Sequence, residues 1–98
     1  MVEIVKSDTF DWWLRKLRDP HAKARVEVRI RRLSLGNAGD VRPIGGGLSE
    51  ARIDHGPGYR VYFMQRNTVL IILLCGGDKR TQANDIELAK GLAEDWRG

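Results

Sequence analysis

The run at residues 69–75 constrains the fold of this chain more than any other stretch, because its odd-numbered and its even-numbered residues are both apolar. In a strand these two sets lie on opposite faces. A strand with this pattern needs cover on both faces, so we expect it to lie inside a sheet and not at an edge. The run has the length of a strand and is too short to span a bilayer. The sheet is therefore expected to form around it.

Two amphipathic strands, Leu48–Ile53 and residues 59–64, precede this run. Apolar and polar side chains alternate in both, so each strand turns one face towards a core and the other face away from it. The Gly-Pro-Gly sequence at residues 56–58 indicates a turn, and the polar segment 65–68 closes a second hairpin. The sequence thus predicts an antiparallel meander with a polar surface that carries Glu50, Arg52, Arg60 and Tyr62.

Three helices are predicted around the meander. The first begins among the capping residues at positions 7–9 and continues with helically spaced apolar residues from Phe10 onwards. The second begins with Asp19 as its cap and a proline at its first position, and it is expected to stop at residues 36–37. The third follows Thr81, which can cap it, and runs to the end of the chain.

The predicted fold class is α+β: a small, mainly antiparallel sheet with two N-terminal helices and a C-terminal helix. Short strands at residues 2–5 and 41–44 would complete the sheet. A chain of 98 residues is long enough for one modest core and not for two. We therefore expect a single domain over residues 1–98.

The composition narrows the class of protein. The formal net charge of +4 favours an anionic partner, either nucleic acid or an acidic protein. Cys75 is the single cysteine, which excludes an internal disulfide or a cysteine-built metal site, and in a buried strand it is an inert core residue.

Charged residues at Glu3, Lys6 and Asp8 precede any long apolar run. We therefore expect no secretory signal, no membrane association and a cytoplasmic location.

The second predicted helix carries a dense set of cations with few matching acids. Such a set is either a solvated helix face or a contact for nucleic acid or the ribosome, and the sequence leaves both interpretations open. The cations are Lys23, Arg25, Arg29, Arg31 and Arg32.

Several motifs occur together in a characteristic order: F-x-x-W-L, G-N-A-G-D, S-E-A-R-I, G-P-G-Y-R-V-Y-F and L-L-x-G-G-D-K-x-x-Q-x-x-D-I. Together they cover nearly the whole chain, which resembles the HigB-like, phage Gp49-like addiction-module killer branch of the RelE/ParE toxin superfamily. Two departures are small: Ala51 stands where a larger aliphatic residue is usual, and Arg80 where a small hydroxyl residue is common.

The resemblance implies a toxin of a type II toxin–antitoxin pair with a RelE/ParE-like α+β fold. Many relatives cleave mRNA on the ribosome without a metal, whereas the ParE-like branch inhibits DNA gyrase. The implied partners are mRNA, the ribosome and a cognate antitoxin, in HigB-like operons usually a HigA-like helix-turn-helix protein. The first hypothesis is therefore a ribosome-dependent mRNA endonuclease, or mRNA interferase, that inhibits translation. The alternatives are a non-enzymatic inhibitor of gyrase and a degenerate toxin that only binds its antitoxin.

Metal-independent RNA cleavage needs a proton acceptor for the 2′-hydroxyl, cations for the phosphate and a proton for the leaving oxygen. Arg60 and Lys79 are the candidates for the phosphate, and Tyr62 or Glu50 for proton transfer. The two candidates for proton transfer each have an alternative role. Tyr62 could stack on a base, and Glu50 could form an ion pair with Arg52 or Arg60. The predicted catalytic residues are thus Arg60, Lys79, Tyr62 and Glu50.

Further residues are predicted to bind RNA around this centre. Arg52 would position the backbone, and Gln82 lies at the junction between the last strand and the last helix, where loop residues commonly carry function. His55 has a suitable pKa for proton transfer but lies beside a turn, which also fits a surface loop residue. The predicted RNA-binding set is Arg52, Gln82, His55, Lys23, Arg29 and Arg32. No group has metal-ligand spacing, so no metal and no cofactor is expected.

Overall fold

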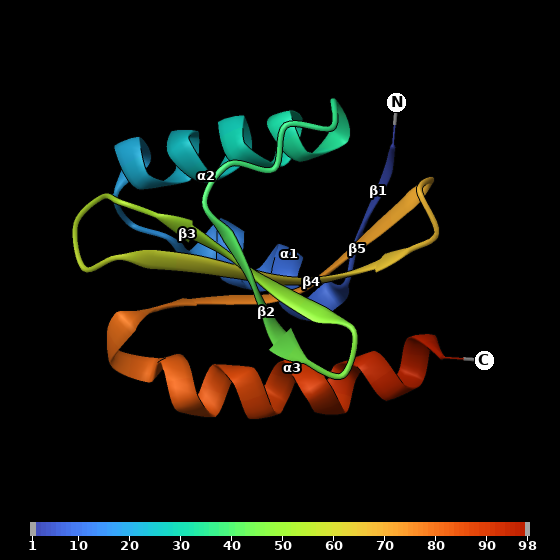
Figure 1. Ribbon diagram of the computed structural model, residues 1–98. Helices are drawn as coiled ribbons and strands as arrows, with labels where there is room; N and C mark the ends of the chain where they lie inside the picture. The colour runs from blue at the N-terminus through green and yellow to red at the C-terminus, as the bar shows by residue number, and fades with distance from the viewer. Residues whose placement is uncertain (1, 98) are drawn as a thin grey trace.

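A five-stranded sheet separates two helical layers in the computed structural model, which describes residues 2–97 (Figure 1). Helices α1 and α2 pack against one face of the sheet, and α3 covers the other. In chain order, the elements are β1 (Glu3–Lys6), α1 (Asp8–Lys16), α2 (Pro20–Ser34), β2 (Val41–Gly45), β3 (Leu48–Ile53), β4 (Tyr59–Arg66), β5 (Leu70–Asp78), a 3₁₀ turn (Lys79–Thr81) and α3 (Gln82–Trp96).

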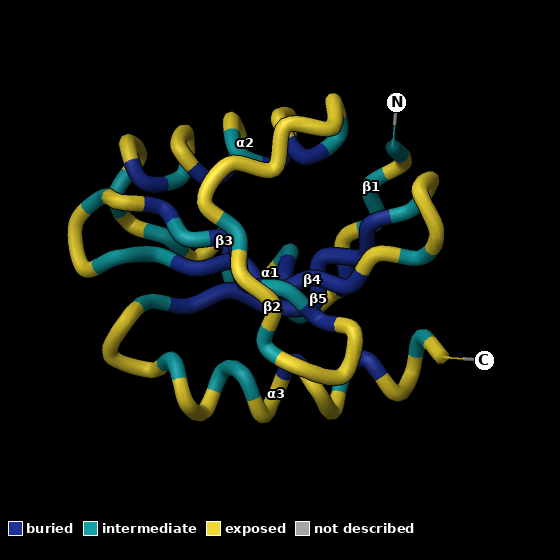
Figure 2. Tube along the Cα trace, in the orientation of Figure 1, coloured by how far each residue is buried: buried dark blue, intermediate teal, exposed yellow. Residues whose placement is uncertain are grey.

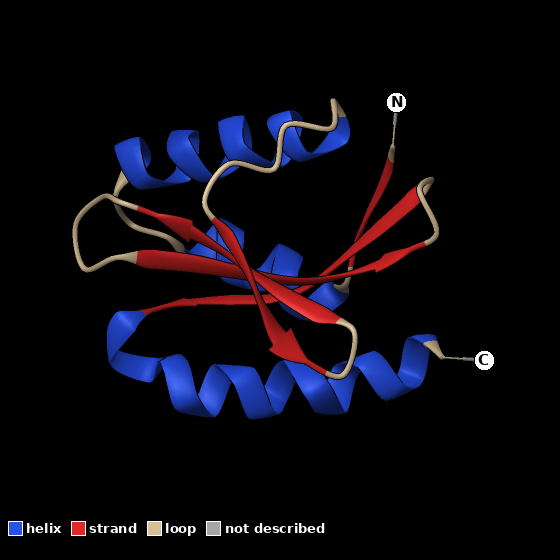
Figure 3. Cartoon of the chain, viewed as in Figure 1, coloured by secondary structure: helices blue, strands red, loops and turns tan. Residues whose placement is uncertain are grey.

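The strand order in the sheet is β1-β5-β4-β3-β2 (Figure 3). Strands β3, β4 and β5 form the predicted antiparallel meander, and β2 adds to β3 in the antiparallel sense. Strand β1 pairs with β5 in parallel, so β5 has neighbours on both sides. The prediction of an α+β fold with a mainly antiparallel sheet and an internal apolar strand is confirmed.

Strand β5 is longer than predicted. The predicted strand covered residues 69–75, but Gly76 and Gly77 also pair with Val61 and Arg60 of β4. The two glycines admit neighbouring side chains instead of ending the strand. A Cβ atom on Gly76 would overlap the ring of Trp13, and a Cβ atom on Gly77 would overlap the carboxylate of Asp85.

Helices α1 and α2 begin at predicted capping residues. The Ser7 hydroxyl accepts a hydrogen bond from the backbone N–H of Phe10 at 3.0 Å and donates one to the carbonyl of Leu74 at 2.7 Å. Asp19 caps α2, with Pro20 at the first helical position. The helices bury a first core cluster on the sheet that includes Phe10, Leu14, Val26, Ile30, Leu33, Ala51, Ile53, Val61, Phe63, Ile71 and Leu73.

A second core cluster lies on the opposite face of the sheet. The sheet therefore divides the apolar interior into two clusters, where a single core was expected. Ala89 and Ala93 bring α3 close to the sheet because their side chains are small. This cover buries the face that was predicted to be a polar surface, which corrects that prediction. Glu50 and Tyr62 are 0% exposed and Arg60 is 8% exposed. Figure 2 shows β4 and β5 as mostly buried chain between the helical layers.

No helix within residues 2–97 has both the length and the apolar character of a membrane span.

Candidate functional site

Three predicted site residues meet in one groove although they come from three different elements. Arg52 is on β3, Arg60 is on β4 and Lys79 begins the turn after β5. We call this the cationic groove; it encloses about 300 Å³. Its lining residues are Asp40, Arg52, Ile53, Asp54, Gly58, Arg60 and Lys79.

The pairing of β3 with β4 explains why the arginines meet. Arg52 and Arg60 are direct cross-strand partners, so their side chains leave the same face of the sheet. Like charges opposite each other repel, and each arginine has an acidic neighbour: Nη2 of Arg52 lies 3.2 Å from Oδ1 of Asp40, and Nε of Arg60 lies 3.7 Å from Oε2 of Glu50. The prediction that Glu50 pairs with an arginine therefore holds for Arg60 and not for Arg52.

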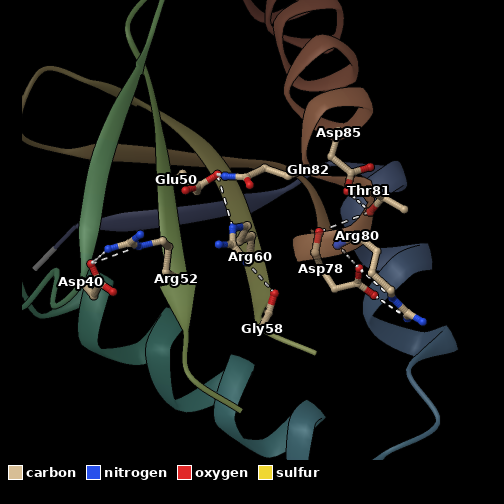
Figure 4. Close-up of polar contacts among 10 residues, drawn as sticks. All are labelled: Asp40, Glu50, Arg52, Gly58, Arg60, Asp78, Arg80, Thr81, Gln82 and Asp85. Carbon is tan, nitrogen blue, oxygen red and sulfur yellow. Dashed lines mark hydrogen bonds and ion pairs between the residues drawn. The ribbon is translucent and has the colours of Figure 1, made fainter. Parts of the chain in front are cut away.

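Arg60 is held between the core and the groove (Figure 4). Its Nη1 donates a hydrogen bond of 2.8 Å to the carbonyl of Gly58, which also lines the groove. Behind it, the buried Glu50 carboxylate accepts a 2.8 Å hydrogen bond from Nε2 of Gln82 on α3. One hydrogen bond and one ion pair thus orient the nearly buried guanidinium at the groove wall.

Tyr62 and Glu50 do not reach the groove, which corrects their assignment as proton carriers. They are direct partners across β3 and β4, and both are fully buried beneath α3. Burial, together with the facing Glu50 carboxylate, raises the pKa of Tyr62 far above its ordinary value. The phenol therefore stays protonated, and it cannot stack on a base that approaches from solvent.

Gln82 is likewise occupied inside the protein. Its amide binds Glu50, so its predicted role in RNA binding is replaced by a structural one. Lys79, in contrast, is exposed and takes part in no ion pair among residues 2–97. It is the most accessible cation of the groove.

A second groove, here called the α2 groove, holds most of the other predicted RNA-binding residues. It lies between α2 and the end of β3 and encloses about 500 Å³. Arg32 and His55 line it, as does Arg29, whereas Lys23 does not. The lining residues are His21, Ala24, Arg25, Val28, Arg29, Arg32, Ile53, Asp54 and His55.

Arg29 and His55 hold the loops beside this groove. The Arg29 guanidinium donates to the carbonyls of Ala38 at 3.0 Å, Arg52 at 2.7 Å and Asp40 at 2.7 Å. His55 Nε2 lies 3.0 Å from Oδ2 of Asp19, a contact that lowers the pKa of the Asp19 carboxyl. Both side chains thus have structural partners, and all three nitrogens of the Arg29 guanidinium are bound to carbonyls.

Sequence reasoning missed the two carboxylates of the cationic groove, Asp40 and Asp54. Asp54 is two residues after Arg52, so in an extended segment both side chains lie on the same side. This alternation could have indicated its position. Asp40 is brought in by the pairing of β2 with β3, for which no local sequence signal exists. Asp54 makes no hydrogen bond through its side chain with any described residue, and it lines both grooves.

Within the described part of the chain, no three His, Cys, Asp or Glu side chains gather as metal ligands would. The cationic groove offers instead three cations around an open volume. The guanidinium and ammonium groups of such a groove are suited to an anion of the size of a phosphodiester, with the nearly buried Arg60 on one element and the exposed Lys79 on another.

The fold and the groove therefore define the class: a small α+β domain with a groove at its antiparallel sheet that is lined by two arginines and a lysine. A protein of Haemophilus influenzae, described as an uncharacterized protein, is 52% identical to this chain over 94 residues, which is 96% of this chain and 95% of the relative. The chain belongs to the same family as that protein. No family model matches the sequence.

Proposed function

We propose that this protein is the toxin of a type II toxin–antitoxin pair and that it cleaves mRNA on the ribosome without a metal. The observation that carries this proposal is the meeting of Arg52, Arg60 and Lys79 in one groove. The arrangement of a five-stranded, mainly antiparallel sheet between helices is compatible with a RelE/ParE-like fold, which forms part of the proposal.

The three cations suit the charge that develops during phosphodiester cleavage. Attack by a 2′-hydroxyl places additional negative charge on the phosphate, and preorganised donors stabilise that charge most effectively. Arg60 is preorganised by Glu50 and by the Gly58 carbonyl, so we assign it to the phosphate. Lys79 adds a point charge to the phosphate or the leaving oxygen.

The proton acceptor must differ from the residues predicted, because Tyr62 and Glu50 are buried. Asp54 is exposed and lines the same groove as Arg60 and Lys79. We assign it to the 2′-hydroxyl proton. Asp40 is less suited to this role, since Arg52 already binds its carboxylate.

A toxin of this kind acts in the cytoplasm, where mRNA and ribosomes are found, and a cognate antitoxin keeps it inactive. The family resemblance favours a HigA-like helix-turn-helix antitoxin. The net charge of +4 supports either an RNA or an acidic protein as the binding partner.

The proposal is tested by mapping mRNA 5′ ends minutes after induction of the chain without its antitoxin. Cuts within translated frames are expected for the wild type and should disappear in Arg60→Ala. Because that change leaves the buried Glu50 without its partner, Lys79→Ala is the second variant, since Lys79 is exposed and its loss leaves the fold intact. Lys90→Ala, on the exposed side of α3, is the matched control and should cut as the wild type does.

One observation favours the second candidate, a non-enzymatic inhibitor that acts on DNA gyrase as ParE-like proteins do. The residues first predicted to transfer protons are buried, and a groove that carries three cations can bind a target without cleaving it. Growth arrest with intact mRNA and induced DNA damage signalling would support this candidate. Absence of growth arrest in the wild type would support a degenerate toxin that only binds its antitoxin.

A further inference from the structure

The α2 groove adjoins the cationic groove, and we propose that it binds the backbone of single-stranded RNA as the substrate continues beyond the cleavage position. This inference deepens the proposed function and rests on it, because it names the surface along which the same substrate extends. It assigns binding roles to Arg25 and Arg32.

The charge of the α2 groove is suited to a polyanion. Arg25 and Arg32 are exposed, line the groove and form no ion pair within residues 2–97. They lie two helical turns apart on the same side of α2, about 10 Å along the helix axis, so they can contact different phosphates. Asp54 is the single carboxylate among the described lining residues, and it stands at the junction with the other groove.

The two grooves share a wall, which gives the RNA a continuous path. Ile53 and Asp54 line both of them. A backbone that passes over Asp54 would therefore meet Arg60 and Lys79 on one side and Arg25 on the other. In this arrangement Asp54 faces the ribose between the two phosphate-binding surfaces, where the proposed proton transfer takes place.

The floor of the α2 groove favours RNA over a protein segment. Its apolar residues are Ala24, the half-exposed Val28 and Ile53, and none of its lining residues is Phe, Tyr, Trp, Leu or Met. Protein docking sites generally depend on large aromatic or aliphatic anchors, and this groove offers no aromatic one. A base or ribose can rest on such a surface while the arginines hold the phosphates.

The inference is tested with the double variant Arg25→Gln/Arg32→Gln of the full chain. The probe is a fluorescent 2′-O-methyl RNA of about 12 nucleotides, which cannot be cleaved through its 2′-oxygen. Binding is measured by anisotropy over a range of salt concentrations. We expect binding at least about fivefold weaker than the wild type and a salt dependence reduced by about 1.4, which corresponds to two lost phosphate contacts.

The matched control is Lys23→Gln/Arg31→Gln, which removes the same charge from the same helix outside the groove. It should weaken binding less than about twofold. Equal losses in the two double variants would overturn the inference, because only the total charge would then matter. Binding of a polyglutamate peptide that exceeds RNA binding and is lost in Arg25→Gln/Arg32→Gln would also overturn it, since the groove would then serve an acidic protein.

These outcomes are independent of the cleavage test. If the wild type cuts no mRNA in cells while the groove variants lose RNA binding selectively, the proposed nuclease function fails and the RNA-binding groove stands. If the wild type cuts mRNA and both double variants bind equally, the groove assignment fails and the nuclease function stands.

Discussion

Nε of Arg60 lies 3.7 Å from Oε2 of Glu50, and this contact joins the second core cluster to the cationic groove. The Glu50 side chain is fully buried, while the Arg60 side chain is 10% exposed and lines the groove. Gln82 on α3 binds the same carboxylate oxygen. Glu50 therefore positions a groove cation from inside the protein and does not itself line the groove.

Replacement of Glu50 by glutamine should lower the free energy of unfolding by about 2 kcal/mol, because it removes a charged hydrogen-bond acceptor from a buried position and leaves Arg60 without its partner. Urea unfolding measures the loss. Glu87→Gln, at an exposed position of α3, is the control and should change stability by less than about 0.5 kcal/mol. An unchanged unfolding free energy for Glu50→Gln would mean that the ion pair contributes nothing to the fold.

Removal of the Tyr62 hydroxyl should be tolerated. That hydroxyl is buried and has no hydrogen-bond partner among the described residues, so Tyr62→Phe discards an uncompensated polar group. We expect an unfolding free energy equal to the wild type or higher by up to about 1 kcal/mol. Under the proposed nuclease function, the pattern of mRNA cuts should also stay unchanged. Loss of cleavage with intact stability would instead return Tyr62 to the catalytic set.

The raised pKa of Tyr62 predicts a loss of stability at alkaline pH. The unfolded phenol ionises near pH 10, whereas the folded one keeps its proton. Above about pH 10 the unfolded state therefore binds fewer protons than the folded state, its free energy falls relative to the folded state, and the protein loses stability. Burial also raises the pKa of Cys75 to about 12, in the same direction. The protein with Tyr62 and the Tyr62→Phe variant are therefore compared with Cys75→Ala present in both.

In that background, unfolding free energies are measured on both sides of about pH 10. The protein that retains Tyr62 should lose stability more steeply with pH than its Tyr62→Phe counterpart. Parallel profiles would show that Tyr62 titrates alike in the folded and unfolded states.

The glycines of β5 should not tolerate alanine. A methyl group on Gly76 would enter the ring of Trp13, and one on Gly77 would enter the carboxylate of Asp85, so either change should cost at least about 2 kcal/mol. Gly91→Ala on α3 is the control, because a Cβ atom there meets nothing within 4 Å. It should raise the unfolding free energy by about 0.5–1 kcal/mol through helix propensity. A tolerated Gly76→Ala would mean that Trp13 does not pack against this strand.

Local patterns predicted the meander and the helix starts because turns and caps depend on neighbouring residues. Asp19 and Pro20 begin α2 as expected, and the strand Leu48–Ile53 has the expected bounds. The same alternation placed Glu50 and Tyr62 on the face opposite the first core. What the alternation could not reveal is that α3 covers this face, since cover depends on how a distant helix docks.

The candidate site was predictable to the same degree. The alternation of residues in β3 and β4 places Arg52 and Arg60 together, and the exit from β5 brings Lys79. Asp40 depends on the pairing of β2 with β3, and Arg29 on two carbonyls in the segment before β2 and one in β3. These are long-range contacts without a periodic signature, so the sequence alone left Arg29 as one cation among several.

The parallel pairing of β1 with β5 determines when the protein can complete its fold during synthesis. Ser7 binds the carbonyl of Leu74, a contact between residues 67 positions apart. β1 therefore leaves the ribosome long before its partner strand exists, and the two N-terminal helices emerge without a sheet to cover. Closure of such distant contacts is slow, because the entropy of a long loop is lost before any contact is gained. A nascent chain thus has no assembled cationic groove until β5 and the Lys79 that follows it have been translated.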